Sequence, residues 1–184
     1  MYGCIDFLNP RSSYSIGKQA AETLCASYLK EYGVPFIVVR PGHIYGPTAS
    51  ENDNRVASQF LFAAARNEPL VLKSEGIQIR SYCYCLDCAA AVLTILHKGI
   101  YGNAYNISNR DSVISIREMA EIIANYSQCR LVVDVPSDNE KANFNPMLNS
   151  SLDASKLYSL GWTHSFSRTE GFEHSVRILR EIEA

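Results

Sequence analysis

Apolar positions along the chain alternate between the spacing of helices and the spacing of strands. In residues 14–32 they recur every three to four positions, the period of a helix with one apolar face, and Gly33 and Pro35 supply the stop. The next four residues, Phe36-Ile37-Val38-Val39, form an unbroken apolar run. Such a run predicts a strand of a parallel sheet that is covered on both faces.

The same alternation continues to the end of the chain. Ser115 and Glu118 have the spacing of a capping box, which predicts the start of a helix. Predicted loops cover residues 1–12, 41–47 and 136–152. Strands that alternate with helices predict an α/β fold. Further helices are predicted at 56–66, 86–97, 115–126, 153–159 and 167–182, and further strands at 70–72, 77–84, 104–107 and 131–135.

Composition and charge exclude several classes of protein. The 184 residues are enough for one sizeable core or two small lobes, and the formal net charge is only -2. This balance gives no basic excess for nucleic acid. The most apolar stretch, Cys88 to Leu96, is too short to span a membrane. Polar residues interrupt the first positions, so we expect no secretory leader, and we expect neither nucleic acid nor membrane as a partner.

Six cysteines are spread over the chain, at 4, 25, 83, 85, 88 and 129. Cys85-x-x-Cys88 has the spacing of redox and zinc motifs, but no second Cys or His pair at metal-ligand spacing follows it. The neighbouring residues are apolar, which favours buried free thiols and no metal site. Free thiols fit a reducing compartment, so we predict a cytoplasmic protein.

The sharpest chemical signal is Tyr14-x-x-x-Lys18. Residues four apart on a helix project from the same face, one turn apart. A tyrosine hydroxyl is a poor base at neutral pH, and a nearby ammonium favours its ionised form. The pair can therefore exchange a proton with a sugar hydroxyl. Taken alone, the spacing favours an ordinary exposed Tyr and Lys on a helix.

The context of Tyr14 and Lys18 resembles the extended short-chain dehydrogenases of the NAD-dependent epimerase/dehydratase family, which modify nucleotide sugars. The matching blocks occur in the family's order over nearly the whole chain. They are Ala20-Ala21-Glu22, Tyr32-Gly33-Val34-Pro35, Val39-Arg40-Pro41-Gly42-His43-Ile44-Tyr45-Gly46-Pro47, Gly76-Ile77-Gln78-Ile79-Arg80-Ser81-Tyr82-Cys83-Tyr84-Cys85-Leu86-Asp87, Gly102-Asn103-Ala104-Tyr105-Asn106-Ile107 and Leu160-Gly161-Trp162.

This resemblance implies a cofactor-binding role for three residues. Tyr14 would be the catalytic acid/base, and Lys18 would hold the nicotinamide ribose of NAD and favour the ionised tyrosine. Pro41 would pack near the nicotinamide. The NAD site would belong to the full-length parent enzyme, because this chain contains no G-x-G-x-x-G or P-loop pattern.

Four further residues would bind the substrate by the same resemblance. Arg80 would contact the diphosphate, since a guanidinium can bind phosphate oxygens bidentately; its alternative is a surface ion pair. His43 would lie near the sugar and phosphates, or it is a loop histidine without a ligand. Arg55 and Gln59 would lie along the nucleotide, or they belong to a solvated helix start. Asp87 fits a helix cap or dipole partner better than a catalytic group.

The resemblance also implies that the chain is the C-terminal part of such an enzyme. Met1-Tyr2-Gly3 resembles the segment that directly follows the family's catalytic Ser or Thr. We expect residues 1–45 and 84–108 to form part of a Rossmann-like domain, and residues 46–83 and 109–184 to form a substrate-binding lobe.

The expected function is that of an NAD-dependent 4,6-dehydratase, decarboxylase or 4-epimerase acting on a UDP- or dTDP-sugar, or of a fragment of one. The isolated chain is expected to be inactive. An alternative is a non-catalytic module for nucleotide-sugar binding or assembly. An unpaired sheet edge invites pairing, so the expected partner is a complementing N-terminal half or a second copy in a homodimer.

Overall fold

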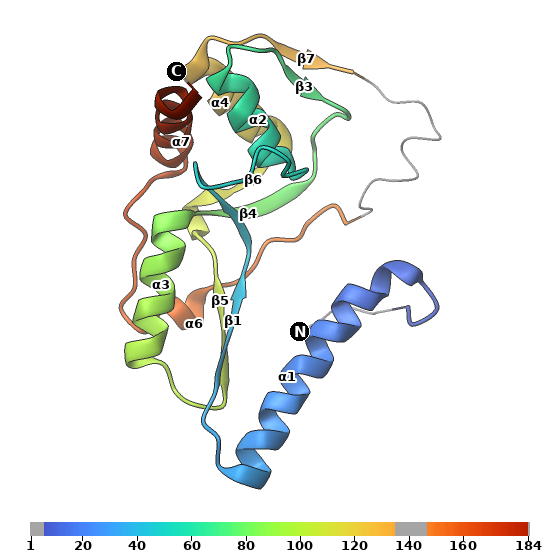
Figure 1. Ribbon diagram of the computed structural model, residues 1–184, viewed down its shortest axis with the longest axis vertical. Helices are drawn as coiled ribbons and strands as arrows, with labels where there is room; N and C mark the ends of the chain where they lie inside the picture. Colours follow the sequence, from blue (N-terminus) through green and yellow to red (C-terminus); the bar gives the residue numbers. More distant parts are fainter. Residues whose placement is uncertain (1–5, 135–146, 184) are drawn as a thin grey trace.

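The computed structural model describes residues 6–134 and 147–183, which form a mixed α/β fold (Figure 1). The helical elements are η1 (Pro10–Ser12), α1 (Ser13–Tyr32), α2 (Val56–Ala65), α3 (Cys85–Lys98), η2 (Arg110–Ser112), α4 (Ile116–Ser127), α6 (Ser155–Tyr158) and α7 (Arg168–Glu183). The strands are β1 (Ile37–Pro41), β2 (His43–Tyr45), β3 (Leu70–Leu72), β4 (Ile79–Tyr84), β5 (Asn103–Ile107), β6 (Val113–Ser115) and β7 (Leu131–Val133).

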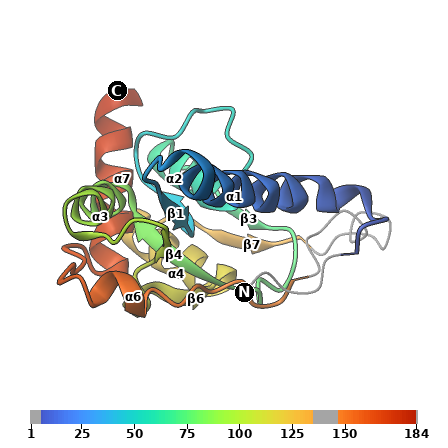
Figure 2. The same cartoon turned by 90° about the horizontal axis from the view of Figure 1, so that it is seen from below.

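The strands form three small sheets. β1 pairs with β5 in parallel, and β3 pairs with β7 in parallel. β4 is the middle strand of the third sheet, parallel to β2 and antiparallel to β6. Figure 2 shows α3 and α1 on opposite sides of β1, and in Figure 1 α1 stands apart from the other helices.

The larger of two core clusters lies where α2, α4 and α7 pack over β3 and β4. The ring of Phe172 on α7 stacks on Tyr45 of β2 with centroids 4.1 Å apart. Tyr82 and Tyr84 of β4 are also buried in this cluster. The helices present small residues to one another, which lets them approach closely: Ala57, Ala64, Ala65, Ala120 and Ala124.

The smaller cluster lies between α3, β5 and the segment around α6. Ala91 and Ile95 of α3 pack there with Tyr105 and Ile107 of β5. Leu157 and Trp162, which come from the later part of the chain, belong to the same cluster. The tail segment therefore returns to the strands of the first 110 residues, and the division into two lobes stays a prediction.

The predicted helices and most predicted strands are present with ends shifted by a few residues. The capping box is confirmed, because Ser115 Oγ accepts from the Glu118 amide at 3.1 Å and Glu118 accepts from the Ser115 amide at 2.7 Å. Two strands were not predicted: β2 lies inside an expected loop, and β6 precedes α4. β2 is surrounded by the glycines and prolines at 41, 42, 46 and 47, which are typical of a loop, and the last residue of β6, Ser115, belongs to the capping box that predicted a helix start. Much of the loop expected at 136–152 lies outside the described residues.

The prediction that the first strand is covered on both faces is wrong. Ile37 and Val38 are half-buried, and Val39 is 38% exposed. The reason is that α3 packs beside β1, whereas α1 contributes no buried residue. Parallel pairing itself was predicted correctly.

The prediction of buried thiols holds for Cys83 alone among the described cysteines. Cys83 is fully buried, whereas Cys25, Cys85, Cys88 and Cys129 are half-buried, and all five are free. Cys4 lies outside the described residues. An apolar neighbourhood in sequence did not guarantee burial, because the surfaces of α1 and α3 are partly open.

Replacing Phe172 by alanine should lower the free energy of unfolding by about 3–5 kcal/mol, since the ring is fully buried against Tyr45. Urea denaturation followed by circular dichroism measures this change. The control is Leu96→Ala on α3, where the side chain is 75% exposed and the change should stay within about 0.5 kcal/mol. Equal effects for the two variants would contradict the packing described.

Candidate functional site

Tyr14 and Lys18 lie on α1 as the sequence predicted. The Lys18 ammonium is 5.5 Å from the centre of the Tyr14 ring, so the two side chains share one face of the helix. The side chain of Tyr14 is largely open to solvent, at 73% exposure. The pair therefore has the predicted mutual position, and the described residues leave Tyr14 largely open to solvent.

A cavity of about 450 Å³ between α1 and β1 brings the predicted cofactor-binding residues together. Tyr14 and Lys18 line it from α1, and Pro41 lines it from the end of β1. An ion pair between Glu22 and Arg40 crosses the same space and ties α1 to β1; the Arg40 Nε donates to Glu22 Oε1 at 2.8 Å. The position of α1 relative to β1 thus depends on a charge pair and on the turn at Gly33.

The residues of this cavity fit one end of a dinucleotide. An ammonium, a phenol and a proline face a space of a size suited to a nicotinamide and its ribose. The sequence contains no glycine-rich turn that would hold the pyrophosphate. The described residues therefore offer contacts for the nicotinamide end of NAD and none of the usual contacts for the remainder.

A second cavity, of about 400 Å³, lies among α2, β3 and β4. Gln59 and Arg80, two of the predicted substrate-binding residues, both line it. Gln59 lies on α2 and Arg80 on β4, and the remaining polar lining residues lie in the segments next to α2, β3 and β4. Its lining includes Asn54, Gln59, Phe60, Val71, Lys73, Gln78 and Arg80.

Arg80 is the most informative residue of the second cavity. Its side chain is only 7% exposed, and no described carboxylate pairs with it. Its Nη1 donates to the carbonyl oxygens of Ile79 at 2.8 Å and Met147 at 3.1 Å. A guanidinium removed from water without a counter-charge is costly, and an anion in the cavity would offset that cost.

His43 and Arg55 lie near this cavity but are not part of its lining. The His43 ring is 5.8 Å from Tyr82, its partner on β4. Partial removal from water, followed by the charges of Arg80 and Arg55, lowers the pKa of His43. Arg55 forms an ion pair with Asp53 at 2.6 Å, and this pair holds the pKa of the Asp53 carboxyl well below its usual range.

Four polar residues of the second cavity were not predicted as ligands: Asn54, Lys73, Ser74 and Gln78. Gln78 lies in the same sequence block as Arg80, two positions before it. That spacing puts the two side chains on one side of an extended chain. Its Oε1 is buried and has no hydrogen-bond partner in the described part of the chain. An unpaired acceptor beside an unpaired cation indicates a place for a ligand that carries both a donor and an anion.

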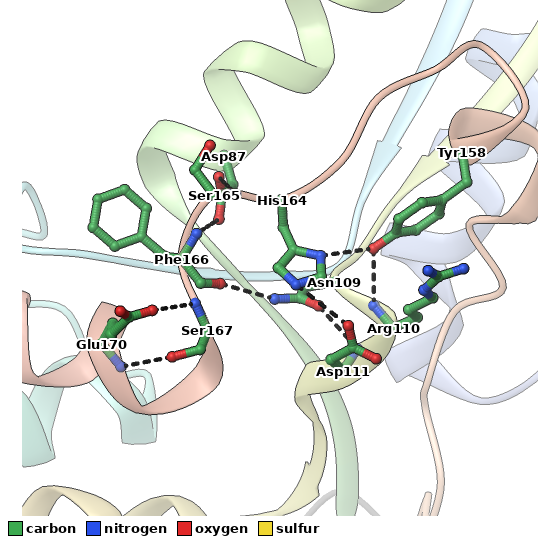
Figure 3. Close-up of polar contacts among 10 residues, drawn as sticks. All are labelled: Asp87, Asn109, Arg110, Asp111, Tyr158, His164, Ser165, Phe166, Ser167 and Glu170. Atoms are coloured by element: carbon green, nitrogen blue, oxygen red, sulfur yellow. Dashed lines mark hydrogen bonds and ion pairs between the residues drawn. The ribbon is translucent and has the colours of Figure 1, made fainter.

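Asp87 acts as an anchor for the tail of the chain rather than as a helix cap. It is 2% exposed, and its carboxylate accepts from the backbone amides of Ser165 at 2.7 Å and Phe166 at 3.2 Å (Figure 3). Directly after Phe166, Ser167 and Glu170 exchange two hydrogen bonds at the start of α7. The N-cap of α3 is Tyr84, so the helix-cap prediction is wrong, whereas Asp87 does lie in the first turn of α3, where a carboxylate can act as a dipole partner.

His164 connects the tail to the turn η2. Its Nδ1 lies 3.2 Å from the Tyr158 hydroxyl, and its Nε2 lies 3.3 Å from an oxygen of Asp111 (Figure 3). Through these two contacts His164 links Tyr158 of α6 to Asp111 of η2.

Within residues 6–134 and 147–183, no group of three or more His, Cys, Asp or Glu side chains could hold a metal ion, and no helix is long and apolar enough to cross a membrane.

Comparison with known proteins identifies the class of this fold and site. The NAD dependent epimerase/dehydratase family matches residues 4–108, more than half of the chain. The protein belongs to this family, as the blocks around Tyr14 and Arg80 indicated.

Curated relatives are longer than this chain. The trifunctional UDP-glucose 4,6-dehydratase/UDP-4-keto-6-deoxy-D-glucose 3,5-epimerase/UDP-4-keto-L-rhamnose-reductase RHM1 of Arabidopsis thaliana is 33% identical over 92% of this chain and 24% of its own length. The dTDP-D-glucose 4,6-dehydratase of Homo sapiens is 26% identical over 94% of this chain and 49% of its own length. The chain thus spans between a quarter and a half of these relatives.

Solved structures share the fold at lower identity. The UDP-glucose 4-epimerase of Thermotoga maritima, solved with UDP-glucose, superposes with a TM-score of 0.81 at 24% identity and covers 93% of this chain and 54% of its own. The dTDP-glucose 4,6-dehydratase of Bacillus anthracis, solved with NAD, gives 0.79 at 22% identity, with 100% and 58% covered. These matches establish the fold.

Replacing Arg80 by methionine should raise the pKa of His43 toward its ordinary value of about 6.5, because a neighbouring positive charge is removed. NMR titration of the imidazole protons measures the shift, and Arg66→Met is the control. Because the folded state disfavours the His43 cation, the contribution of His43 to the free energy of unfolding is fully present above about pH 6.5 and declines as the pH falls below it. An unchanged titration in Arg80→Met would contradict the proximity of the two groups.

Proposed function

We propose that this chain is the nucleotide-sugar-binding part of an NAD-dependent epimerase/dehydratase and that it supplies the proton-transferring pair Tyr14 and Lys18. The observation that carries the proposal is Arg80, a buried cation without a carboxylate partner among the described residues, in a cavity that also holds Gln59 and Gln78. A sugar nucleotide offers that cavity two phosphates and several hydroxyl or imide donors.

The ligand chemistry follows from the lining. Arg80 binds the diphosphate, with the Lys73 ammonium as a second positive charge. Gln59 and Gln78 bind hydroxyl or N–H groups, and the apolar side chains of Phe60 and Val71 contact the nucleoside. The resulting substrate class is UDP- or dTDP-sugars. The names of the relatives support this class, because they act on sugars attached to UDP or dTDP.

In the proposed chemistry the chain's own part is proton transfer. NAD, when bound, supplies the acceptor of a hydride from a sugar carbon. Tyr14 removes the proton of the hydroxyl on that carbon, and the Lys18 ammonium stabilises the phenolate. The fate of the keto sugar separates 4,6-dehydratase, decarboxylase and 4-epimerase. We place the first two ahead of the third, and curated relatives include both dehydratases and a UDP-glucuronic acid decarboxylase.

A non-catalytic module for nucleotide-sugar binding or assembly is the second candidate. It is favoured by α1, which has no buried residue and leaves Tyr14 73% exposed. A proton-transferring pair needs a site from which water is excluded, and the described part of this chain leaves Tyr14 largely open to solvent. Binding of sugar nucleotide without turnover would be the property of this module.

The proposed partner would cover Tyr14 and Lys18 on α1. Among the described strands β1 pairs only with β5, and a further parallel strand would extend this two-stranded sheet. Apolar side chains are exposed on the helices at either side, including Leu24 and Tyr28 on α1 and Leu93 and Leu96 on α3. A segment with a parallel strand and flanking helices satisfies both needs. A complementing N-terminal half fits better than a homodimer, because a second copy offers a short edge strand but no dinucleotide-binding turn.

The isolated chain should bind UDP-glucose or dTDP-glucose, and Arg80→Met should weaken this binding about tenfold to a hundredfold, the loss expected for charge-assisted hydrogen bonds. Isothermal titration calorimetry measures both affinities. The control is Arg66→Met, which removes a cation paired with Glu51 and Glu183 outside the cavity.

Two outcomes of this titration contradict the proposal. The first is absence of binding by the folded, unsubstituted chain. The second is equal affinity of the Arg80→Met and Arg66→Met variants, which would place the anion elsewhere.

Turnover should require a complementing half. The chain alone with NAD and UDP-glucose should give no product. Co-expression with the matching N-terminal half of a related dehydratase should give activity, and Tyr14→Phe should lower it at least about a hundredfold. Product formation is followed by chromatography of the nucleotide sugars. The control is Tyr28→Phe on the same helix, outside the cavity of Tyr14. Equal activity of the two variants would remove Tyr14 from the chemistry.

A further inference from the structure

Three cysteines gather where β4 ends and α3 begins, away from both cavities described above. Cys85 and Cys88 are the first and fourth residues of α3, and Cys83 is the penultimate residue of β4. Cys85 and Cys88 are half-buried, whereas Cys83 is fully buried. The two residues of the Cys-x-x-Cys motif are therefore the reachable ones.

The spacing of Cys85 and Cys88 allows a disulfide with a small local adjustment. Residues three apart on a helix have Cβ atoms about 5–6 Å apart, and a disulfide needs about 3.5–4.5 Å. The first turn of a helix is the easiest place for this closure, because its amides have no partner within the helix. The N-cap residue Tyr84 supplies no side-chain hydrogen bond to that turn, so no cap has to be broken.

The surroundings distinguish the roles of the two thiols. Cys85 is the first residue of α3, where the backbone amides of the first turn have no partner within the helix. Burial, followed by the charge of Cys85, raises the pKa of the Cys88 thiol. Cys85 is accordingly the attacking thiol and Cys88 the resolving one.

Cys83 is unsuited to either role. It is fully buried, and burial together with the nearby Cys88 and Asp87 raises the pKa of its thiol far above the usual range. Asp87 is held in place by the tail amides of Ser165 and Phe166, so its negative charge stays beside these thiols. The pairing is thereby directed to the two residues of α3.

We propose that Cys85 and Cys88 form a dithiol that low-molecular-weight disulfides such as oxidised glutathione convert reversibly to an intramolecular disulfide. The Cys85 thiolate attacks one sulfur of the small disulfide, forms a mixed disulfide and releases one thiolate. The Cys88 thiolate then attacks the Cys85 sulfur and releases the second thiolate. The protein dithiol loses two electrons and two protons, and the small disulfide becomes two thiols.

The oxidation state of this pair is connected to strand β2. The Cys85 sulfur packs directly against Gly46, and any side chain at Gly46 would overlap it. Gly46 follows Tyr45, the last residue of the strand that begins with His43. Rotation of the Cys85 side chain toward Cys88 therefore vacates space at the turn after β2. This connection is independent of whether the neighbouring cavity binds a sugar nucleotide.

The test uses the full chain equilibrated in glutathione buffers from fully reduced to fully oxidised, quenched in acid, alkylated and digested for mass spectrometry. In oxidised buffer the peptide with Cys85 and Cys88 should resist alkylation and be lighter by two hydrogens, and excess reduced glutathione should restore both thiols. Cys88→Ser should accumulate glutathione on Cys85, and Cys85→Ser should stay reduced. The control, Cys25→Ser on α1, should behave like the unsubstituted chain.

The unsubstituted chain alone decides the proposal, so a variant that fails to fold does not obscure it. Alkylation of both Cys85 and Cys88 in fully oxidised buffer would overturn it. So would a disulfide that joins Cys83 to either of them, or a pair that excess reduced glutathione does not reopen. Sugar-nucleotide titration of the same samples is a separate measurement, and its failure would affect only the function proposed above.

Discussion

The burial of Arg80 in β4 is the constraint on which the rest of the arrangement depends. β4 is the middle strand of its sheet, and every residue from Arg80 to Tyr84 is buried. The strand therefore carries a charge into the interior beside Tyr82 and Tyr84, which the packing of α7 covers. A cation in this position is tolerated where an anion can reach it, and the cavity beside α2 gives that access.

The two parts of the candidate site differ in how they are connected to the core. The cavity of Arg80 is built from α2, β3 and β4, whose residues belong to the larger core. Tyr14 and Lys18 instead lie on a helix without buried residues, connected to β1 by the pair of Glu22 and Arg40. The substrate binding proposed above would therefore rest on the chain's own core, whereas the proposed proton transfer would depend on what covers α1.

Local sequence was a good guide wherever a periodic pattern was long. The helix at α1, the capping box of Ser115 and Glu118 and the parallel pairing of β1 were all predicted from nearby residues. The strands β2 and β6 were missed, because the glycines and prolines around β2 are typical of a loop and the last residue of β6 is the helix cap Ser115. Burial was predicted less well. Val39 and Cys88 have apolar neighbours in the sequence, but neither side chain is buried in the fold.

By itself the sequence determined the family, the order of elements and the candidates Tyr14, Lys18, Gln59 and Arg80, because these follow from motifs of fixed spacing. Only the tertiary structure decided which candidates meet. It brought Gln59 and Arg80 to one cavity, joined Arg55 to Asp53, and added Lys73 and Gln78. The physical reason is that a shared cavity depends on how separate strands and helices pack, and spacing along one element does not encode the distance to another.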